Sequence, residues 1–194
     1  MLSGLTHAEQ VKRLIAGGAE IIQLREKRMS PRQFYEASVE AVGLAKRHNI
    51  PVIINDRVDI ALVTGAAGVH LGQDDMPPAA ARKVLGSKAM IGYSTHTVEQ
   101  AVAAASMPVD YIALGPIFPT SSKGDAEDVV GPDTITEVRE RIGEIPIVAI
   151  GGINAENFTK VFSSGADSAA IISALVSDAA LIEARMRAFA ASTV

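Results

Sequence analysis

The chain of 194 residues contains no cysteine. This absence excludes disulfides, thiol nucleophiles and thiolate metal sites, and it is consistent with a cytoplasmic protein. Tryptophan is also absent, and aromatic residues make up only 4% of the sequence, although 48% of it is hydrophobic. The core must therefore be built mostly from Val, Ile, Leu and Ala.

The sequence also lacks the signals of a nucleic-acid or membrane protein. Its net charge of −4 argues against a general binder of nucleic acid or anionic membranes. No apolar segment approaches the roughly 20 residues that span a bilayer, and the N-terminus MLSGLTHAEQ lacks the apolar core of a signal peptide. We therefore expect a cytoplasmic protein with no nucleic-acid or membrane partner, folded as a single domain over residues 1–194.

Short apolar runs recur along the chain with helical segments between them. Several runs are apolar on both faces, as is typical of parallel strands covered by helices. Between them, Ser30, Thr97 and Asn154 stand where helix N-caps are expected, and Gly165 stands where a helix should stop. The alternation predicts an α/β fold with a parallel sheet. The runs are 20–24, 51–55, 68–71, 89–93, 111–114, 147–150 and 168–173.

Two parallel architectures compete. A doubly wound sheet usually has a Gly-rich first turn, and no G-x-G-x-x-G is present. A barrel instead carries functional groups after many successive strands, and polar residues do follow the apolar runs here. We therefore predict a (β/α)8 TIM barrel, with seven recognisable strands and the first strand apparently missing.

The stretch EIIQLREKRM places Gln23, Arg25 and Lys27 two residues apart. Residues at that spacing share one face of a strand, and two cations at a strand end favour an anion site. The alternative is an internal ion pair, for which Glu26 is one candidate partner, although Glu26 should lie on the opposite face.

Carboxylates follow the next two strands. Asp56 comes directly after Asn55, and Asp75 follows the strand after that. If these strands are neighbours, the two carboxylates could hold Mg²⁺, which favours one or two carboxylates plus substrate oxygens. Alternatively, Asp75 caps the next helix, and Asp56 pairs with Arg57 or starts a turn.

Later loops supply possible phosphate contacts. The segment IFPTSSKGD contains Thr120, Ser122 and Lys123 in a long polar loop that could cover an anionic ligand. Gly151 and Gly152 follow a strand, where backbone N–H groups can approach a phosphate, although ordinary turn glycines are the alternative. We expect Ile172 and Ser173 to end the last strand, and the loops after the last two strands of barrels often bind phosphate. A site with two anionic regions suits an enzyme that joins two phosphorylated small molecules.

Seven segments, in order along the chain, resemble thiamine phosphate synthase. They are IIQLREK, INDRVDIAL, GVHLGQDDMP, IGYSTHT, YIALGPIFPTSSK, PIVAIGGI and GADSAAIISAL. The resemblance implies a (β/α)8 barrel and a transferase of an alkyl or aryl group. Such an enzyme joins 4-amino-5-hydroxymethyl-2-methylpyrimidine diphosphate to 4-methyl-5-(2-hydroxyethyl)thiazole phosphate, giving thiamine phosphate and pyrophosphate by a dissociative substitution.

The resemblance also implies roles for individual residues. Asp56 and Asp75 would hold Mg²⁺, and Ser94 would lie by the reacting centre, with Arg25 and Lys123 stabilising the departing charge. The pyrimidine diphosphate would contact Gln23, Arg25, Lys27, Asn55 and Lys123. The thiazole phosphate would contact Thr120, Ser122, Gly152, Ile172 and Ser173, where Ser122 replaces the more usual Thr.

Two other functions remain open at this point. Thiazole tautomerase is a related barrel that usually has a catalytic His where this chain has Pro116, which favours the synthase. A non-catalytic phosphate-ligand-binding barrel is the other alternative. The family begins with a further strand that MLSGLT cannot supply, so we expect exposed sheet edges, reduced stability, or compensation by a partner chain such as a homodimer.

Overall fold

A computed structural model describes residues 4–120 and 128–192. Its contacts divide these residues into two compact units, which are described separately. The first unit contains residues 4–70, 83–90 and 175–192, and the second contains residues 71–82 and 91–174.

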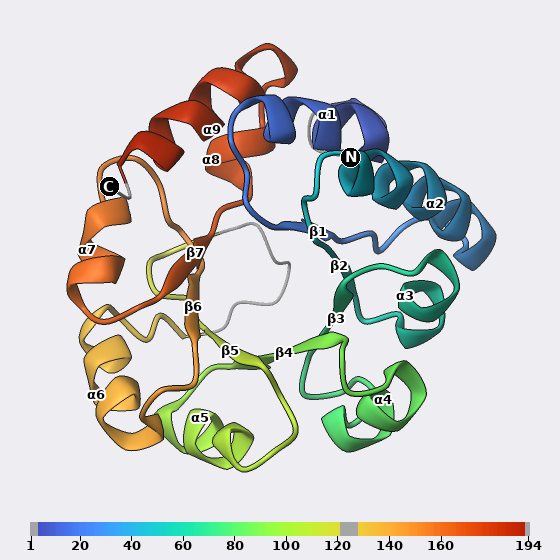
Figure 1. Ribbon diagram of the computed structural model, residues 1–194. Coiled ribbons are helices and arrows are strands. Elements are labelled where there is room, and N and C mark those ends of the chain that lie inside the picture. Colours follow the sequence, from blue (N-terminus) through green and yellow to red (C-terminus); the bar gives the residue numbers. More distant parts are fainter. Residues whose placement is uncertain (1–3, 121–127, 193–194) are drawn as a thin grey trace. The chain divides into compact units, whose positions relative to one another are not determined.

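In the described residues, helices and strands alternate from α1 to α8, and η1 and α9 then follow α8 directly (Figure 1). The strands are β1 Ile22–Leu24, β2 Val52–Asn55, β3 Gly68–Leu71, β4 Met90–Thr95, β5 Tyr111–Leu114, β6 Ile147–Ile150 and β7 Ser168–Ala170. The helices are α1 His7–Ala16, α2 Pro31–Arg47, α3 Val58–Thr64, α4 Pro78–Leu85, α5 Val98–Ala105, α6 Asp133–Ile142, α7 Phe158–Ser163, α8 Ser173–Val176 and α9 Ile182–Ala191, and a 3₁₀ turn, η1, covers Ala179–Leu181.

The strand pairings within each unit are parallel. In the first unit β1 pairs with β2 and β2 with β3, so that Leu24 lies opposite Ile54, and Asn55 opposite His70. In the second unit β4, β5, β6 and β7 pair successively in the same way. Parallel pairing brings the carboxyl ends of neighbouring strands to one edge, which is where polar side chains were expected. The α/β class predicted from the sequence is confirmed.

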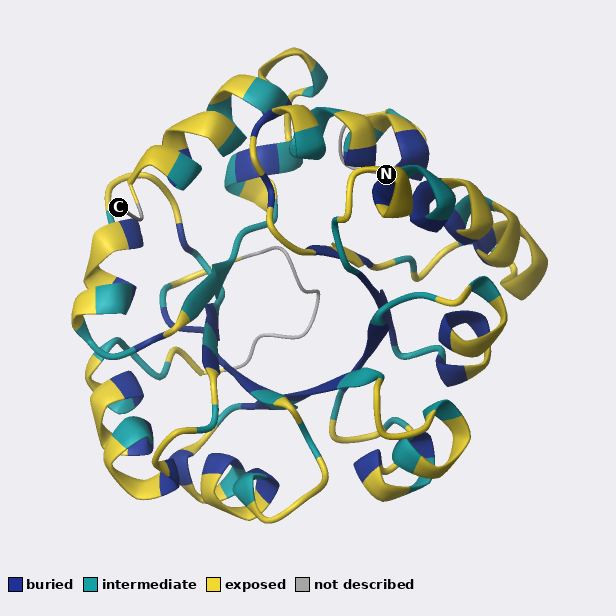
Figure 2. Ribbon diagram, viewed as in Figure 1, coloured by how far each residue is buried: buried dark blue, intermediate teal, exposed yellow. Residues whose placement is uncertain are grey.

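The core consists of aliphatic side chains, as the scarcity of aromatic residues required. Every residue of β2 and of β3 is buried, and the helices bury one face each, as the dark blue segments show (Figure 2). Ile54 and Leu71 are completely inaccessible to solvent. Burial of such a side chain contributes about 1.5–3 kcal/mol.

Two of the three predicted helix caps are confirmed. The Ser30 hydroxyl accepts from the Gln33 N–H and starts α2, and the Thr97 hydroxyl accepts from the Gln100 N–H and starts α5. The prediction that Asn154 caps a helix is wrong, because its side chain accepts from Glu156 and Asn157 in a turn that precedes α7. Gly165, with φ of 102°, lies just beyond the end of α7, as expected.

The strand bounds differ from the apolar runs at two places that affect the site. β4 continues to Thr95, so Ser94 lies within the strand and not after it. β7 ends at Ala170, so the prediction that Ser173 ends this strand is wrong, and Ser173 is instead the first residue of α8. The described residues form seven strands, and none of them supplies an eighth.

No helix within residues 4–120 and 128–192 has the length and apolar character needed to cross a membrane.

Candidate active site

The cationic stretch lies where β1 gives way to α2. Gln23 is the middle residue of β1 and is exposed, whereas Ile22 and Leu24 on either side of it are buried. Arg25 and Lys27 lie in the loop of residues 25–30, beyond the strand, and both are exposed. They are therefore placed by the loop conformation, and not by strand alternation as expected.

Lys27 forms an ion pair with Asp56, the residue directly after β2 (both in the first unit). Lys27 has 53% of its side chain exposed and Asp56 has 21%. The parallel register of β1 and β2 makes this pairing possible, because it brings the two loops that follow these strands to the same end. The internal ion pair given as the alternative does form, with Asp56 and not with Glu26 as the partner of Lys27. Arg57 pairs with Asp59 and not with Asp56, and Asp56 lies at the bend that follows β2, as its turn alternative expected.

Asp56 adopts an unusual backbone conformation. Its φ is +62°, a left-handed value that carries a strain cost of about 1–3 kcal/mol for residues other than glycine. The Asp56 N–H donates to the His70 carbonyl at 2.8 Å, which holds the backbone in place. Asn55, immediately before it, is 8% exposed. Such strain is concentrated at ligand sites, and at this position the Asp56 carboxylate pairs with Lys27.

In the second unit, Asp75 and Ser94 both lie close to the end of a strand. The Asp75 Oδ2 accepts from the Gly72 N–H at 2.7 Å, so it closes the turn that follows β3. The Gln73 side chain donates to the Ser94 carbonyl at 2.6 Å. The turn after β3 is thereby fastened to β4 beside Ser94.

Gly151 and Gly152 are explained by the close approach of another backbone. Their φ values are +97° and +65°, and a Cβ at Gly151 would lie 2.5 Å from the Cα of Pro116. A Cβ at Gly152 would lie 2.5 Å from the Pro119 carbonyl oxygen. The segment after β5 therefore packs directly on the loop after β6, where the Ile117 N–H donates to Ile150 at 2.9 Å.

This packing brings together two of the sequence segments that were predicted to bind phosphate. Phe118 donates to the Gly151 carbonyl at 3.0 Å, and the exposed Thr120 follows two residues later. The sequence signal for this contact was the GG pair after a strand, but nothing in it identified Pro116 and Phe118 as the partners. The peptide bond between Gly115 and Pro116 is cis.

The remaining predicted residues are Ile172, Ser173, Ser122 and Lys123. Ile172 is half-buried, directly before the start of α8, and Ser173 is exposed. Ser122 and Lys123 lie outside the described residues. Among the residues described, no group of three or more His, Asp or Glu side chains could hold a metal ion. The predicted magnesium site has two carboxylates, so the absence of a larger group from the described residues does not test it.

Comparisons with known proteins identify the family. A family model described as thiamine monophosphate synthase matches residues 2–175. Thiamine-phosphate synthase from Methanocella arvoryzae is 48% identical over 90% of this chain and 82% of its own length. The Methanospirillum hungatei JF-1 protein of the same name is 47% identical over 89% of this chain and 84% of its own length.

Solved structures agree with this assignment. Thiamine phosphate pyrophosphorylase from Pyrococcus furiosus has a TM-score of 0.87 and 33% identity, covering 95% of this chain and 87% of that protein. This similarity confirms the TIM-barrel-like fold class predicted from the sequence, with seven strands in the described residues. An N-(5'-phosphoribosyl)anthranilate isomerase from the same organism, 18% identical with a TM-score of 0.68, shares the fold alone. Together, the family match over residues 2–175 and the identities near one half show that the chain belongs to the thiamine monophosphate synthase family.

Proposed function

We propose that the chain joins 4-amino-5-hydroxymethyl-2-methylpyrimidine diphosphate to 4-methyl-5-(2-hydroxyethyl)thiazole phosphate, giving thiamine phosphate and pyrophosphate. The observation that carries this proposal is the 45–48% identity to proteins named thiamine-phosphate synthase over about nine-tenths of the chain. Pro116, in place of the histidine usual in the tautomerase, also supports the synthase.

The charges after β1 and β2 suit the first substrate. Arg25 provides a planar fork for phosphate oxygens, and Lys27 provides a mobile positive charge. Without substrate, Lys27 is neutralised by Asp56. We infer that a bound diphosphate pairs with Lys27 in place of Asp56, and that the Asp56 carboxylate then binds a metal cation.

The proposed cation is Mg²⁺, held by Asp56 and Asp75. Both side chains offer the hard oxygen donors that this metal prefers, and each follows a strand in the manner expected of a barrel site. When bound, the ion would neutralise charge on the departing pyrophosphate. In the same proposal, Gln23 and Asn55 contact the pyrimidine substrate, and Ser94 lies by the reacting carbon.

The second substrate is assigned to the loops after β5, β6 and β7. Thr120 and Gly152 belong to two segments that are hydrogen-bonded to each other, which supports a common role. We assign the thiazole phosphate to these residues together with Ser122, Ile172 and Ser173, and the departing charge to Lys123 and Arg25. Electrostatic stabilisation of a leaving group needs no general base, so the site's task is to hold both substrates in line.

A direct assay tests the proposal. Both substrates are supplied with Mg²⁺, and thiamine phosphate and pyrophosphate are measured. Arg25→Ala should lower kcat/KM at least a hundredfold, since a preorganised charge contact is worth about 3 kcal/mol. Arg28→Ala removes an exposed cation of the same loop and is the matched control, expected to stay within about threefold of the unmodified chain.

The possible outcomes separate the alternatives. Isomerisation of the thiazole carboxylate phosphate without thiamine phosphate would identify a tautomerase. Tight binding of both ligands without any product would identify a binding protein. Equal losses in the Arg25 and Arg28 variants would remove Arg25 from the proposed role.

A further inference from the structure

The backbone conformation of the loop that carries Arg25 and Lys27 is not fixed by hydrogen bonds to other backbone groups in the part of the chain that the structure describes. It spans residues 25–30, between the end of β1 and the start of α2. Within the described residues, the N–H groups of residues 26–29 donate to no backbone carbonyl. Because an exposed loop with unpaired amides has many accessible conformations, something else must fix the path of this one.

Glu26 supplies the missing acceptor. Its Oε1 accepts from the Arg28 N–H at 2.7 Å, so the side chain folds back over the bend that follows it. The backbone N–H groups of Met29 and Lys27 also act to lower the pKa of this carboxyl. Partial burial works to raise the pKa of Glu26, but these three N–H groups lower it below its ordinary value, which keeps the acceptor ionised.

The far end of the loop is closed by a second side chain. The Ser30 N–H donates to the Gln33 Oε1 at 3.0 Å, and the Gln33 N–H donates to the Ser30 hydroxyl at 3.3 Å. The amides of Arg28 and Ser30 thus donate to the side chains of Glu26 and Gln33. Satisfied amides of this kind give a short loop one backbone path.

The backbone path of the loop determines the positions from which the Arg25 and Lys27 side chains extend. Arg25 and Lys27 flank Glu26, and both side chains are exposed, so packing does not fix their positions. Lys27 nevertheless reaches Asp56 at the end of β2. A change of backbone path at residues 26–28 would move the Lys27 Cα relative to its partner, and a displacement of about 1 Å can cost a hundredfold in rate.

We propose that Glu26 is a positioning residue for the reaction: it fixes the loop from which Arg25 and Lys27 hold the diphosphate. This inference rests on the proposed function. Glu26 touches no reacting atom and acts only through the conformation of residues 27–29.

Charge and position predict opposite effects, which makes the inference testable. A carboxylate next to a diphosphate site repels the ligand, so by charge alone its removal should tighten anion binding. If Glu26 instead holds the loop, its removal should weaken that binding. Glu36→Ala is the matched control, because it removes a carboxylate from the exposed face of α2 that pairs with Arg32 at 3.0 Å.

The experiment measures binding of inorganic pyrophosphate by calorimetry without Mg²⁺, and then steady-state kinetics with both substrates. Glu26→Ala should weaken pyrophosphate binding about tenfold and raise KM for the pyrimidine diphosphate, with KM for the thiazole phosphate unchanged. Glu26→Gln keeps an acceptor oxygen of the same reach, so it should restore binding to within about threefold. Glu26→Asp keeps the charge but shortens the side chain, and should bind less well than Glu26→Gln.

Several results would overturn the inference. They are pyrophosphate binding by Glu26→Ala that is unchanged or tighter, equal rises in both KM values, or Glu26→Asp outperforming Glu26→Gln. If Glu26→Ala does not fold, as judged by circular dichroism, the Gln and Asp pair decides alone. Failure of the proposed function would be seen separately, as absence of product from the unmodified chain.

Discussion

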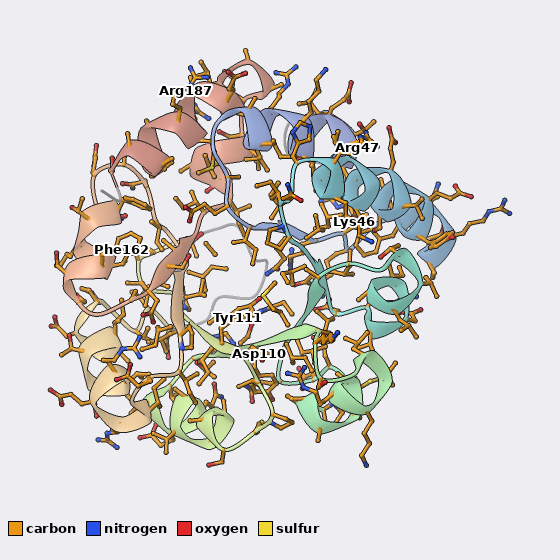
Figure 3. All side chains as sticks on the ribbon, viewed as in Figure 1. Lys46, Arg47, Asp110, Tyr111, Phe162 and Arg187 are labelled. Carbon is orange, nitrogen blue, oxygen red and sulfur yellow. The ribbon has the colours of Figure 1, made fainter. Side chains whose placement is uncertain are left out.

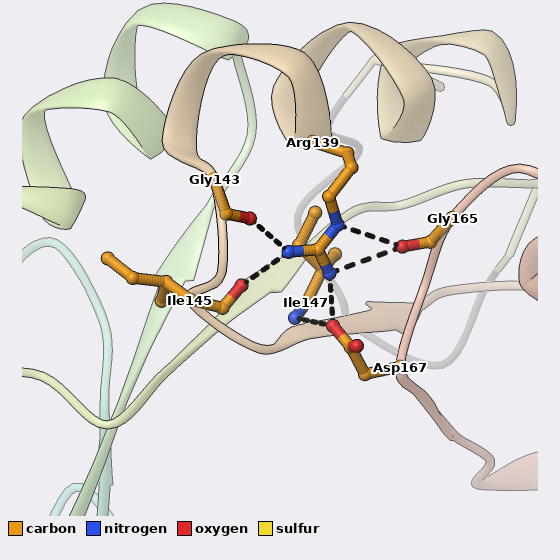
Figure 4. A network of polar contacts seen from close by, with 6 residues as sticks. All are labelled: Arg139, Gly143, Ile145, Ile147, Gly165 and Asp167. Carbon is orange, nitrogen blue, oxygen red and sulfur yellow. Dashed lines mark hydrogen bonds and ion pairs between the residues drawn. The ribbon is translucent and has the colours of Figure 1, made fainter.

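Arg139 on α6 should stabilise the second unit without contributing to catalysis. Its guanidinium lies among the amino-terminal ends of β6 and β7 (Figure 4). It donates to the carbonyls of Gly143, Ile145 and Gly165 and pairs with Asp167. Asp167 also accepts from the Ile147 N–H at 2.7 Å. One side chain therefore joins the end of α6, the start of β6 and the residue before β7.

The expected magnitude follows from these contacts. Hydrogen bonds to a charged group are worth about 1.5–3 kcal/mol each when well shielded from solvent. Arg139 has 26% of its side chain exposed and Asp167 has 52%, so water replaces part of what is lost. We expect Arg139→Ala to lower the free energy of unfolding by about 2–3 kcal/mol, a total well below the sum of the separate bonds. For a chain of this size that corresponds to a fall in Tm of roughly 4–12 °C.

Arg141→Ala is the matched control on the same helix. Arg141 forms an ion pair with Glu137, one turn away, and both side chains are about half exposed. Such a surface pair contributes about 0.3–0.5 kcal/mol. Arg139→Lys should lose about half as much stability as Arg139→Ala, because an ammonium cannot reach all four acceptors at once.

The assay is urea unfolding followed by circular dichroism, with kcat/KM measured in parallel. Activity should be unchanged at temperatures where the variant is folded, because these contacts lie at the ends of the strands opposite the proposed site. The reasoning is refuted if Arg139→Ala is no less stable than Arg141→Ala, or if it loses activity while remaining fully folded.

Three further predictions concern other parts of the chain. Asp110→Ala should destabilise by about 1–3 kcal/mol, because its carboxylate, which lies just before β5 (Figure 3), accepts from the Ile91 N–H at 2.7 Å; a urea midpoint equal to that of the unmodified chain would contradict this. Asp75→Asn should raise the Mg²⁺ concentration needed for half-maximal rate while Tm stays the same, and unfolding of the variant would instead assign Asp75 a structural role. Burial lowers the pKa of His7 in the folded state, and the nearby Glu26 carboxylate opposes this in part. The contribution of neutral His7 to stability should therefore be present above about pH 6.5 and lost as the pH falls. The urea midpoint of His7→Phe should change less between about pH 7.5 and 5.5 than that of the unmodified chain, and parallel pH profiles of the two proteins would contradict this.

Local sequence was sufficient to predict most of the strands. The bounds of β3, β5 and β6 coincide with the apolar runs 68–71, 111–114 and 147–150, because polar or glycine residues end each run. β7 was misjudged because Ile171 and Ile172 continue the apolar run beyond the last paired residue. Ile171 and Ile172 are only half-buried and lie outside the paired strand, so an apolar run does not by itself show where strand pairing ends.

The chemistry of the site was predicted by residue type, but its pairings were not. Arg25 and Lys27 were expected on a strand face, and they lie in a loop whose conformation depends on Glu26, a residue to which no role in the site was given. Likewise, Asp56 was expected to bind a metal, and its contact with Lys27, 29 positions earlier, was not foreseen. That contact exists because β1 and β2 pair in a parallel register with Leu24 opposite Ile54.

By itself, the sequence determined the alternation of strands and helices, the aliphatic core and the supply of cations, carboxylates and glycines at strand ends. These properties depend on residues close together in the chain, where propensity and periodicity act. The tertiary structure alone decided that Lys27 pairs with Asp56, that the segment after β5 packs on Gly151 and Gly152, and that Arg139 donates to three backbone carbonyls. Every residue offers a backbone carbonyl, so no sequence pattern marks the acceptors of Arg139, and the GG pair indicates a close backbone approach without indicating which distant segment makes it.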